Sequence, residues 1–253
     1  MHTNLDLQSI KEDLEQLLYK AAEIARRGFE SEHKDTQTKS DANDVVTKYD
    51  IEINDLIVDH LRENYPDFSI ISEESPTLSG TSDYSFVIDP IDGTRNFTRG
   101  VPIFFTGIGI AKDEQAIFSI TLNPITDELF YAIKGGGAFC NGQRLKVSTR
   151  TAPLSDITLC TFPDKTHQKN IFLNIIERVH QIRNNVCCHE EISGVACQKY
   201  DAFVAKGPSA WDYYHYLLVE EAGGRVTDWA GDEFDISKDN IIVSNGEIGR
   251  AHV

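Results

Sequence analysis

The chain has 253 residues, 40% apolar and 25% charged, which are the proportions of an ordinary folded protein and exclude a disordered one. Its 24 Lys and Arg against 40 Asp and Glu give a net charge of −16, which argues against a nucleic-acid polymer as partner. No apolar run is long enough to span a membrane and no signal peptide is visible, so we expect a cytoplasmic protein without a membrane partner.

The first half of the chain carries two helical patterns followed by strands. Ser9 is the expected cap of a helix that runs to about Arg27, because apolar residues recur there every three or four positions. A second helix is expected from about Asp50 to Asn64, ended by Pro66. The strands expected after these helices are 68–71, 86–88, 104–111, 115–122 and 128–133, and the glycines at 135–137 end this series.

The second half alternates between strand and helix patterns. Strands are expected over 156–161, 225–227 and 241–244, and helices over 166–182 and 210–222. This alternation indicates an α/β layer, whereas the consecutive strands of the middle indicate an antiparallel sheet. We therefore expect a mixed α/β (α+β) fold with a boundary between 145 and 155, dividing the chain into 1–150 and 151–253.

The most informative segment is 89–97, with the sequence DPIDGTRNF, which directly follows an apolar strand. Asp89 and Asp92 converge on one point if the chain turns, and the segment holds a proline and a glycine that favour a turn. Converging carboxylates repel each other unless a cation lies between them, and magnesium prefers such oxygen ligands. Gly93 and Thr94 offer backbone N–H groups to an anion. The segment predicts a metal and a phosphate side by side; the alternative is a solvated turn.

Other carboxylates stand at the ends of neighbouring elements. Glu73 and Glu74 follow an apolar strand, and Asp212 stands at the start of a helix. Each of them alone is explained as a cap or a turn residue. Three acidic sites, each beside the end of a strand or helix, fit a shared metal cleft better than chance placement.

With these motifs the chain resembles the inositol monophosphatase family of magnesium-dependent, lithium-sensitive phosphatases. The resemblance spans roughly residues 10 to 245, with several separate motifs in the same order. The segments that carry it are Lys39 with Asp44–Thr47 and Asp50, Ile71–Ser75, Asp89–Phe97, Gly135–Phe139 with Asn141–Gly142, Ala210–Asp212 and Glu221–Gly224. It implies a layered αβαβα fold, a homodimer and the hydrolysis of a small phosphate monoester.

The resemblance also implies ligands for two or three magnesium ions. Glu73, Asp89 and the backbone carbonyl of Ile91 would hold the first ion. Asp89, Asp92 and Asp212 would hold the second, and a third, weaker site would use Glu73 and water. Such ions lower the pKa of bound water and offset charge on the phosphoryl group, which explains how so acidic a protein binds an anion.

The remaining roles follow from the same resemblance. Thr94 and Asp50 would orient the attacking water, and the N–H groups of Gly93 and Thr94 would hold the phosphate. The residues expected in catalysis are Asp50, Glu73 and Thr94. Those expected at the substrate are Asp92, Gly93, Thr94, Glu191 and Asp212.

The substrate region departs from the inositol-specific pattern, while the metal motifs are intact. Ala205 stands where that subgroup has a Glu that contacts inositol hydroxyls, and Glu191 stands at an Asp position. Residues 186–188, Val-Cys-Cys, replace a Gly-Ser-Ala segment. Histidinol phosphate, a nucleotide 3′- or 2′-phosphate, NADP and sugar bisphosphates therefore remain alternative substrates. A non-catalytic protein that binds a phosphate ligand on the same scaffold is the alternative of another class.

Several side chains near these motifs have two interpretations. Arg95 either contacts a second anionic group of the substrate or points to solvent, and we favour the solvent position. The pair Glu190 and Glu191 either contacts a substrate amine or is solvated, and we favour the solvated position. The aromatic residues of helix 210–222 wall a pocket or, as we expect, pack in the interior. His189 and His215 are expected to pack or lie at the surface rather than bind metal. The apolar run 100–111 is the expected dimer interface.

Overall fold

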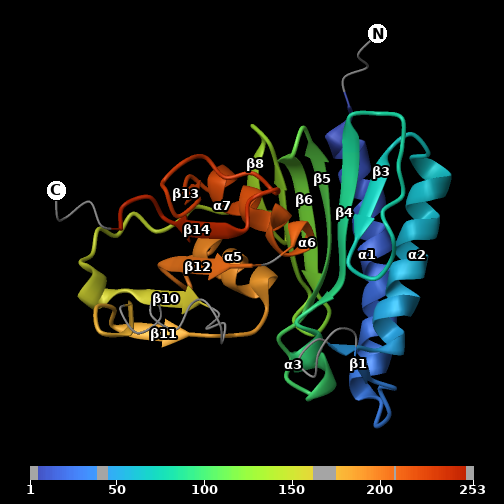
Figure 1. Ribbon diagram of the computed structural model, residues 1–253, viewed down its shortest axis with the longest axis horizontal. Helices are drawn as coiled ribbons and strands as arrows, with labels where there is room; N and C mark the ends of the chain where they lie inside the picture. The colour runs from blue at the N-terminus through green and yellow to red at the C-terminus, as the bar shows by residue number, and fades with distance from the viewer. Residues whose placement is uncertain (1–4, 39–44, 162–174, 208, 249–253) are drawn as a thin grey trace.

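The computed structural model describes residues 5–38, 45–161, 175–207 and 209–248 (Figure 1). The expected mixed α+β fold is confirmed. Two long helices cover one face of a seven-stranded sheet, short helices cover its other face, and a five-stranded sheet lies beyond them (Figure 1). Among the described helices, none combines the length and the apolar character needed to cross a membrane.

The two long helices are α1 (Leu7–Glu30) and α2 (Lys48–Asn64). The expectation that Ser9 caps the first helix is wrong, because Asp6 is the cap. The Asp6 carboxylate accepts hydrogen bonds from the backbone N–H groups of Gln8 at 3.2 Å and Ser9 at 3.1 Å. Ser9 therefore lies inside the first turn, where its own N–H needs a partner. Between the two helices, β1 (Gln37–Thr38) pairs with β2 (Val45–Val46).

The large sheet has the strand order β3-β4-β5-β6-β7-β8-β9, parallel between its first two strands and antiparallel elsewhere. Its strands are β3 (Ser69–Ser72), β4 (Tyr84–Asp92), β5 (Phe105–Lys112), β6 (Gln115–Asn123), β7 (Glu128–Ile133), β8 (Gly137–Cys140) and β9 (Gln143–Arg144). The expected end of the strand series at the glycines is wrong. Gly137 begins β8, and the chain pairs antiparallel with β7 after the turn.

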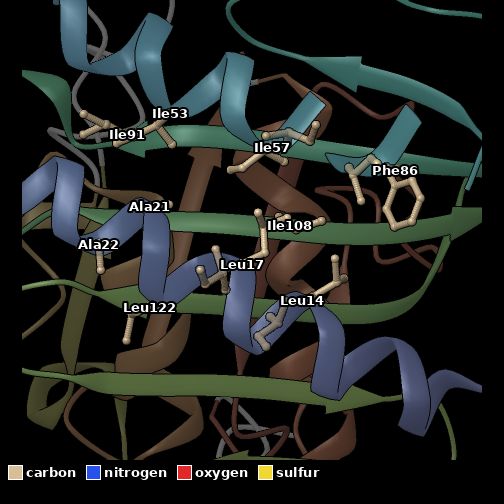
Figure 2. Packing of buried hydrophobic residues seen from close by; sticks show 14 of the residues in the cluster. Leu14, Leu17, Ala21, Ala22, Ile53, Ile57, Phe86, Ile91, Ile108 and Leu122 are labelled. Atoms are coloured by element: carbon tan, nitrogen blue, oxygen red, sulfur yellow. The ribbon is translucent and has the colours of Figure 1, made fainter. Parts of the chain in front are cut away.

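The helices are held on this sheet by apolar side chains (Figure 2). Leu14 and Leu17 of α1 and Ile53 and Ile57 of α2 are fully or almost fully buried against the strands. Run 104–111 is also interior: its apolar residues contribute to the cores on the two faces of the sheet. The expectation that 100–111 forms a dimer interface is therefore wrong for all but the start of that run.

The smaller sheet has the order β11-β10-β12-β14-β13. Its strands are β10 (Thr158–Thr161), β11 (Gln181–Arg183), β12 (Ala202–Lys206), β13 (Arg225–Thr227) and β14 (Asn240–Ser244). The short helices between the sheets are α5 (Cys188–Ala196), α6 (Ala210–Tyr213), the 3₁₀ turn η2 (Tyr214–Tyr216) and α7 (Leu217–Glu221). One apolar core joins residues of both sheets through these helices, so the two halves of the chain pack together.

Two expectations for the second half need correction. The helix expected over 166–182 falls largely on 162–174, outside the described residues, and its last residues are strand β11. The helix expected over 210–222 is divided into α6, η2 and α7. The division of the chain into 1–150 and 151–253 stays a prediction.

Candidate metal centre

A pocket of about 170 Å³ opens where β4 ends. Acidic side chains dominate it, and Arg95 is the one cation among the described residues that line it. The lining residues are Val45, Glu73, Asp89, Ile91, Asp92, Gly93, Thr94, Arg95, Val186 and Asp212. The pocket thus draws on β2, β4, the segment after β3, the loop before α5, and α6.

Three of these carboxylates converge, as the sequence predicts. One oxygen from each of Asp89, Asp92 and Asp212 lies within 4.8 Å of the other two. Residues three apart in a regular strand face opposite sides of the sheet. Here β4 continues to Asp92 with a register shift between Asp89 and Asp92, and this irregularity brings both side chains into one pocket. The expected end of the strand near 88 was therefore too early.

The electrostatics of this group call for a cation. Burial, then the charges of Glu73, Asp92 and Asp212, raise the pKa of Asp89 well above its ordinary value. Burial and the charge of Asp92 likewise raise the pKa of Asp212 to about 8. The Asp89 Oδ1 atom is buried and has no hydrogen-bond partner within the described part of the chain. Buried, mutually repelling carboxylates with an unpartnered oxygen fit a hard divalent cation.

Asp92 also meets the start of α5. Its Oδ2 accepts the backbone N–H of His189 at 2.5 Å, and its Oδ1 accepts the N–H of Cys188 at 3.2 Å. The thiol of Cys187 lies 3.2 Å from the same Oδ2. Cys187 is the residue at the N-cap position, and it provides no side-chain cap of its own. Asp92 therefore caps α5 from another element of the fold.

Asp212 is fixed at the start of α6. Its Oδ2 accepts the backbone N–H of Ser209 at 2.8 Å, in a capping arrangement that spans the first turn. Glu73 lies just after β3, where its backbone N–H bonds the carbonyl of Ile88 at 3.3 Å, and it is half-buried. Both residues line the pocket, as the sequence predicts.

Asp50 and Thr94 form a second polar group at the edge of the pocket. Asp50 is buried in the first turn of α2, where its Oδ2 accepts the backbone N–H of Thr47 at 2.9 Å. The hydroxyl of Thr94 lies 3.2 Å from Asp50 Oδ1 and 2.9 Å from the carbonyl oxygen of Ile91. Burial is the main reason that the pKa of Asp50 rises to about 6, and hydrogen bonds from Thr47 and Thr94 oppose that rise.

Gly93 begins the short helix α3 (Thr94–Thr98) and has a φ of 90°. Only glycine adopts this conformation without strain. A Cβ atom there would also lie 2.9 Å from the carbonyl oxygen of Ile103. The glycine therefore lets the chain turn sharply from the carboxylates of β4 into the backbone N–H groups of α3.

A model of the inositol monophosphatase family matches residues 6–252. The chain belongs to this family. It is 34% identical to Nus factor SuhB of Pseudomonas aeruginosa, over 91% of this chain and 89% of that protein. It is 32% identical to inositol monophosphatase 3 of Solanum lycopersicum, over 92% of this chain and 91% of that protein.

Solved structures agree with this assignment. The SuhB protein of Bartonella henselae is 31% identical, with a TM-score of 0.88, over 94% of this chain and 95% of that one. The IMPase of Thermotoga maritima is 30% identical, with a TM-score of 0.85, over 94% and 92% of the two chains. Membership of this family supports a phosphatase.

The sequence predicts that Glu191 is solvated, but this side chain lies in the interior. The predicted solvated acidic pair is wrong, because Glu191 is fully buried and Glu190 is largely buried. Glu191 Oε1 accepts the backbone N–H of Asn185 at 2.8 Å, and burial raises the pKa of this carboxyl well above its ordinary value. Glu190 accepts the hydroxyl of Tyr200 at 3.1 Å. Glu191 does not line the pocket as described, and its contact with substrate stays a prediction.

The tyrosines of this region pack in the interior, as expected, whereas Trp211 is only partly buried. Tyr213, Tyr214 and Tyr216 are almost completely buried, and none of them lines the pocket. Arg95 differs from its expected position in solvent: it is half-buried and lines the pocket beside Thr94. It therefore faces whatever fills the pocket.

The two histidines are interior hydrogen-bonding residues. His215 lies between Ser119 Oγ, 2.6 Å from Nδ1, and Ser193 Oγ, 2.8 Å from Nε2. His189 Nε2 lies 3.3 Å from the carbonyl oxygen of Trp211 and donates to it. Burial lowers the pKa of both imidazoles, so they remain neutral at physiological pH. The expected packing of the two histidines is confirmed by their complete burial.

The sequence did not point to every residue of the pocket. Val45 and Val186 line it, although neither was named as a catalytic, metal-binding or substrate-binding residue. For Val186 a signal was present, because it replaces a glycine of the family segment. Lys39 and Asp44, which contribute to the family resemblance, lie outside the described residues.

Proposed function

We propose that this family member is a magnesium-dependent phosphomonoesterase that hydrolyses a small phosphorylated metabolite by the attack of water. One observation carries the proposal. The buried carboxylates of Asp89 and Asp92 converge in a pocket with the partly buried carboxylate of Asp212, and Asp89 Oδ1 has no hydrogen-bond partner among the described residues. Gly93 and Thr94, which directly follow Asp92, line the same pocket. A cation site next to an anion site suits a metal-bound phosphate ester.

The ligand sets follow the family pattern. Glu73, Asp89 and the carbonyl of Ile91 would hold one ion, and Asp89, Asp92 and Asp212 a second. A third, weaker ion would use Glu73. All five residues line the same pocket, which supports this assignment. Bound magnesium would supply an activated water and positive charge against the phosphoryl oxygens.

Asp50 and Thr94 are proposed to orient the attacking water. A hydroxyl has one hydrogen, so Thr94 donates either to Asp50 or to the carbonyl of Ile91. When the Ile91 carbonyl is occupied by a cation, the remaining acceptor is Asp50. The lone pairs of Thr94 Oγ1 are then available to accept a hydrogen bond from water in the pocket. Asp50 must be ionised for this, which its pKa of about 6 allows near neutral pH.

The phosphate is proposed to bind at the start of α3. The backbone N–H groups of Gly93 and Thr94 would donate to its oxygens, and both residues line the pocket. Asp92 and Asp212 would meet the substrate through the same metal-bound phosphate. Arg95 adds a positive charge at the wall of the pocket, where it opposes the negative charge of the carboxylates.

This proposal does not specify which alcohol leaves when the phosphate ester is hydrolysed. Relatives named inositol monophosphatase favour an inositol phosphate. Ala205, however, replaces the glutamate of the inositol-specific subgroup, and it is fully buried in β12. It therefore offers no hydrogen bond to a sugar hydroxyl. Histidinol phosphate, 3′- or 2′-nucleotides and NADP remain alternatives.

A rival of another class comes from the relatives named Nus factor SuhB, at up to 34% identity. Such a protein could bind a ligand or a partner on this scaffold without turnover. The complete set of carboxylates and Thr94 favours the enzyme. The net charge of −16 argues against an RNA or DNA partner unless a local basic surface supplies the contact.

The deciding experiment measures phosphate release with magnesium, with and without EDTA. The substrates are inositol 1-phosphate, histidinol phosphate, adenosine 3′,5′-bisphosphate, NADP and fructose 1,6-bisphosphate. We expect one or more to be hydrolysed, and EDTA to abolish the activity. Asp89→Asn, purified identically, is the control for a contaminating phosphatase. Activity that survives EDTA and this substitution would contradict the proposal, as would silence across the panel with magnesium demonstrably bound.

Two further proposals concern the state of the protein. We propose a homodimer in the cytoplasm, on the family pattern. Light scattering of the purified protein gives the mass directly, and a monomer at working concentration would overturn the first of these proposals.

A further inference from the structure

Val186 combines an unfavourable backbone conformation with a place in the pocket wall. Its φ is 55°, in the left-handed region that a β-branched residue adopts only at a cost. The other non-glycine residues with positive φ in the described part of the chain are Asp, Glu, Asn or Gln. Strain of this kind persists only where the surroundings enforce it. Val186 lines the pocket beside the carboxylates.

Hydrogen bonds on both sides hold this conformation. The N–H of Val186 bonds the side-chain oxygen of Asn184 at 3.2 Å. The backbone of Asn185 is held on both sides: its N–H bonds Glu191 at 2.8 Å, and its carbonyl accepts the side-chain amide of Asn96 at 2.7 Å. Asn96 belongs to α3 and Glu191 to α5, so the elements on either side of the pocket hold this loop in place.

The side chain of Glu191 therefore helps to hold the loop that precedes α5. It is fully buried, one oxygen bonds Asn185, and the other has no partner among the described residues. It bonds the N–H of Asn185, the residue that precedes Val186, so its contribution to the pocket is indirect.

Because the pocket is small, the side chain of Val186 affects the size of the leaving group that it can hold. The pocket measures about 170 Å³, and ligand sites for drug-sized molecules are roughly 300–1,000 Å³. Phosphate and its cations must share this volume with the start of the leaving group. Glycine at 186 would relieve the left-handed strain and remove an isopropyl group from the wall.

We propose that Val186 is a specificity-determining residue that narrows the pocket and restricts the enzyme to phosphate esters of small, slender alcohols. This inference rests on the proposed function, since it concerns the leaving group of that reaction. Bulky rings attached directly at the phosphate meet the isopropyl group of Val186. Smaller leaving groups bind without contacting this isopropyl group.

The test compares Val186→Gly with Glu114→Gly. Glu114 is an exposed, left-handed residue (φ 63°) in the turn between β5 and β6. That turn is at the opposite end of β5 from Phe105, which pairs with Asp92 of the site. Both variants relieve strain, but only the first widens the pocket. Melting temperatures within a few degrees of wild type, or higher, establish that both variants are folded.

The first readout is binding of methylphosphonate and phenylphosphonate to the calcium-loaded proteins by calorimetry. These probes share one head group and differ in bulk. We expect Val186→Gly to raise the phenyl-to-methyl affinity ratio at least about fivefold, and Glu114→Gly to leave it unchanged. A ratio unchanged within twofold in Val186→Gly overturns the inference.

The second readout is turnover of glycerol 2-phosphate and phenyl phosphate. The ratio of kcat/KM for the two substrates should shift toward phenyl phosphate in Val186→Gly alone. An unchanged ratio in an active enzyme contradicts the inference and leaves the proposed function standing. An inactive wild-type protein contradicts the proposed function, and the binding ratio then still decides whether Val186 restricts the pocket.

Discussion

The carboxylate of Asp92, at the end of β4, accepts the backbone N–H of His189, in the first turn of α5, at 2.5 Å. One proposed metal ligand therefore also caps a helix from the second half of the chain. The contact satisfies a backbone N–H group of the first turn of α5, which has no partner within its own helix. The position of a metal ligand and the packing of the two halves are coupled through a single side chain.

The first prediction is that Asp92→Asn destabilises the protein as well as inactivating it. An amide keeps one acceptor oxygen, so its NH₂ group faces one of the N–H donors of Cys188 and His189. A buried, unsatisfied donor costs about 1–3 kcal/mol. At about 2–4 °C per kcal/mol, the melting temperature should fall by several degrees.

The control is Asp6→Asn, the same substitution at the cap of α1, where Asp and Asn serve equally well. It should leave the melting temperature nearly unchanged. An Asp92→Asn protein as stable as wild type would show that the contact with α5 contributes little.

The second prediction concerns Asp89→Asn, which should have opposite effects on stability and activity. Asp89 is buried among Glu73, Asp92 and Asp212, and these charges raise its pKa. Removing its charge relieves that repulsion in the metal-free protein. We therefore expect a higher melting temperature in EDTA, loss of the magnesium-induced rise in melting temperature, and loss of phosphatase activity. A variant that is less stable than wild type in EDTA would contradict this account.

Much of the fold and of the metal centre could be predicted from the sequence because the signals are local. Helical periodicity marked α1 and α2, and the spacing of Asp89 and Asp92 after an apolar strand marked the metal pocket. The burial of Glu191 could not be predicted, because the loop at Asn185 that it bonds is held in place by Asn96 of α3, which is remote in sequence. Periodicity did not mark helix α5, and its cap, Asp92, is remote in sequence.

The third prediction is that the metal-free protein loses stability as pH rises. The pKa of Asp50 is about 6 and that of Asp212 about 8 in the folded protein, against an ordinary value of 3.8. Between pH 4 and 8 the folded state therefore holds protons that the unfolded state has released, so the free energy of unfolding falls with pH. In EDTA the melting temperature should decline across this window. Magnesium should reverse the decline, because it favours the ionised carboxylates.

Thermal melts at a series of pH values, with EDTA or with magnesium, test this prediction. Asp212→Asn removes the group with the higher pKa and should flatten the upper part of the window. A melting temperature in EDTA that is constant or rises between pH 5 and 8 would show that these carboxylates are not protonated in the folded protein.

The last prediction distinguishes the effect of the Thr94 hydroxyl group from the effect of the branched shape of its side chain. Thr94→Val keeps the branched side chain but removes the group that lies 3.2 Å from Asp50 and 2.9 Å from the carbonyl of Ile91. Without it, Asp50 has no link to water in the pocket. We expect kcat to fall by about 10²–10⁴-fold, the usual contribution of a positioned proton acceptor. KM and magnesium affinity should change little, because Thr94 contributes its side chain to neither.

Thr94→Ser is the matched control, because it restores the hydroxyl and loses only a methyl group. It should recover most of the activity lost in Thr94→Val. The activity of wild type and of Thr94→Ser should also decline as pH falls through about 6, where Asp50 takes up a proton. If Thr94→Val retains wild-type kcat, the Asp50–Thr94 pair has no part in orienting water. The carboxylates alone would then account for catalysis.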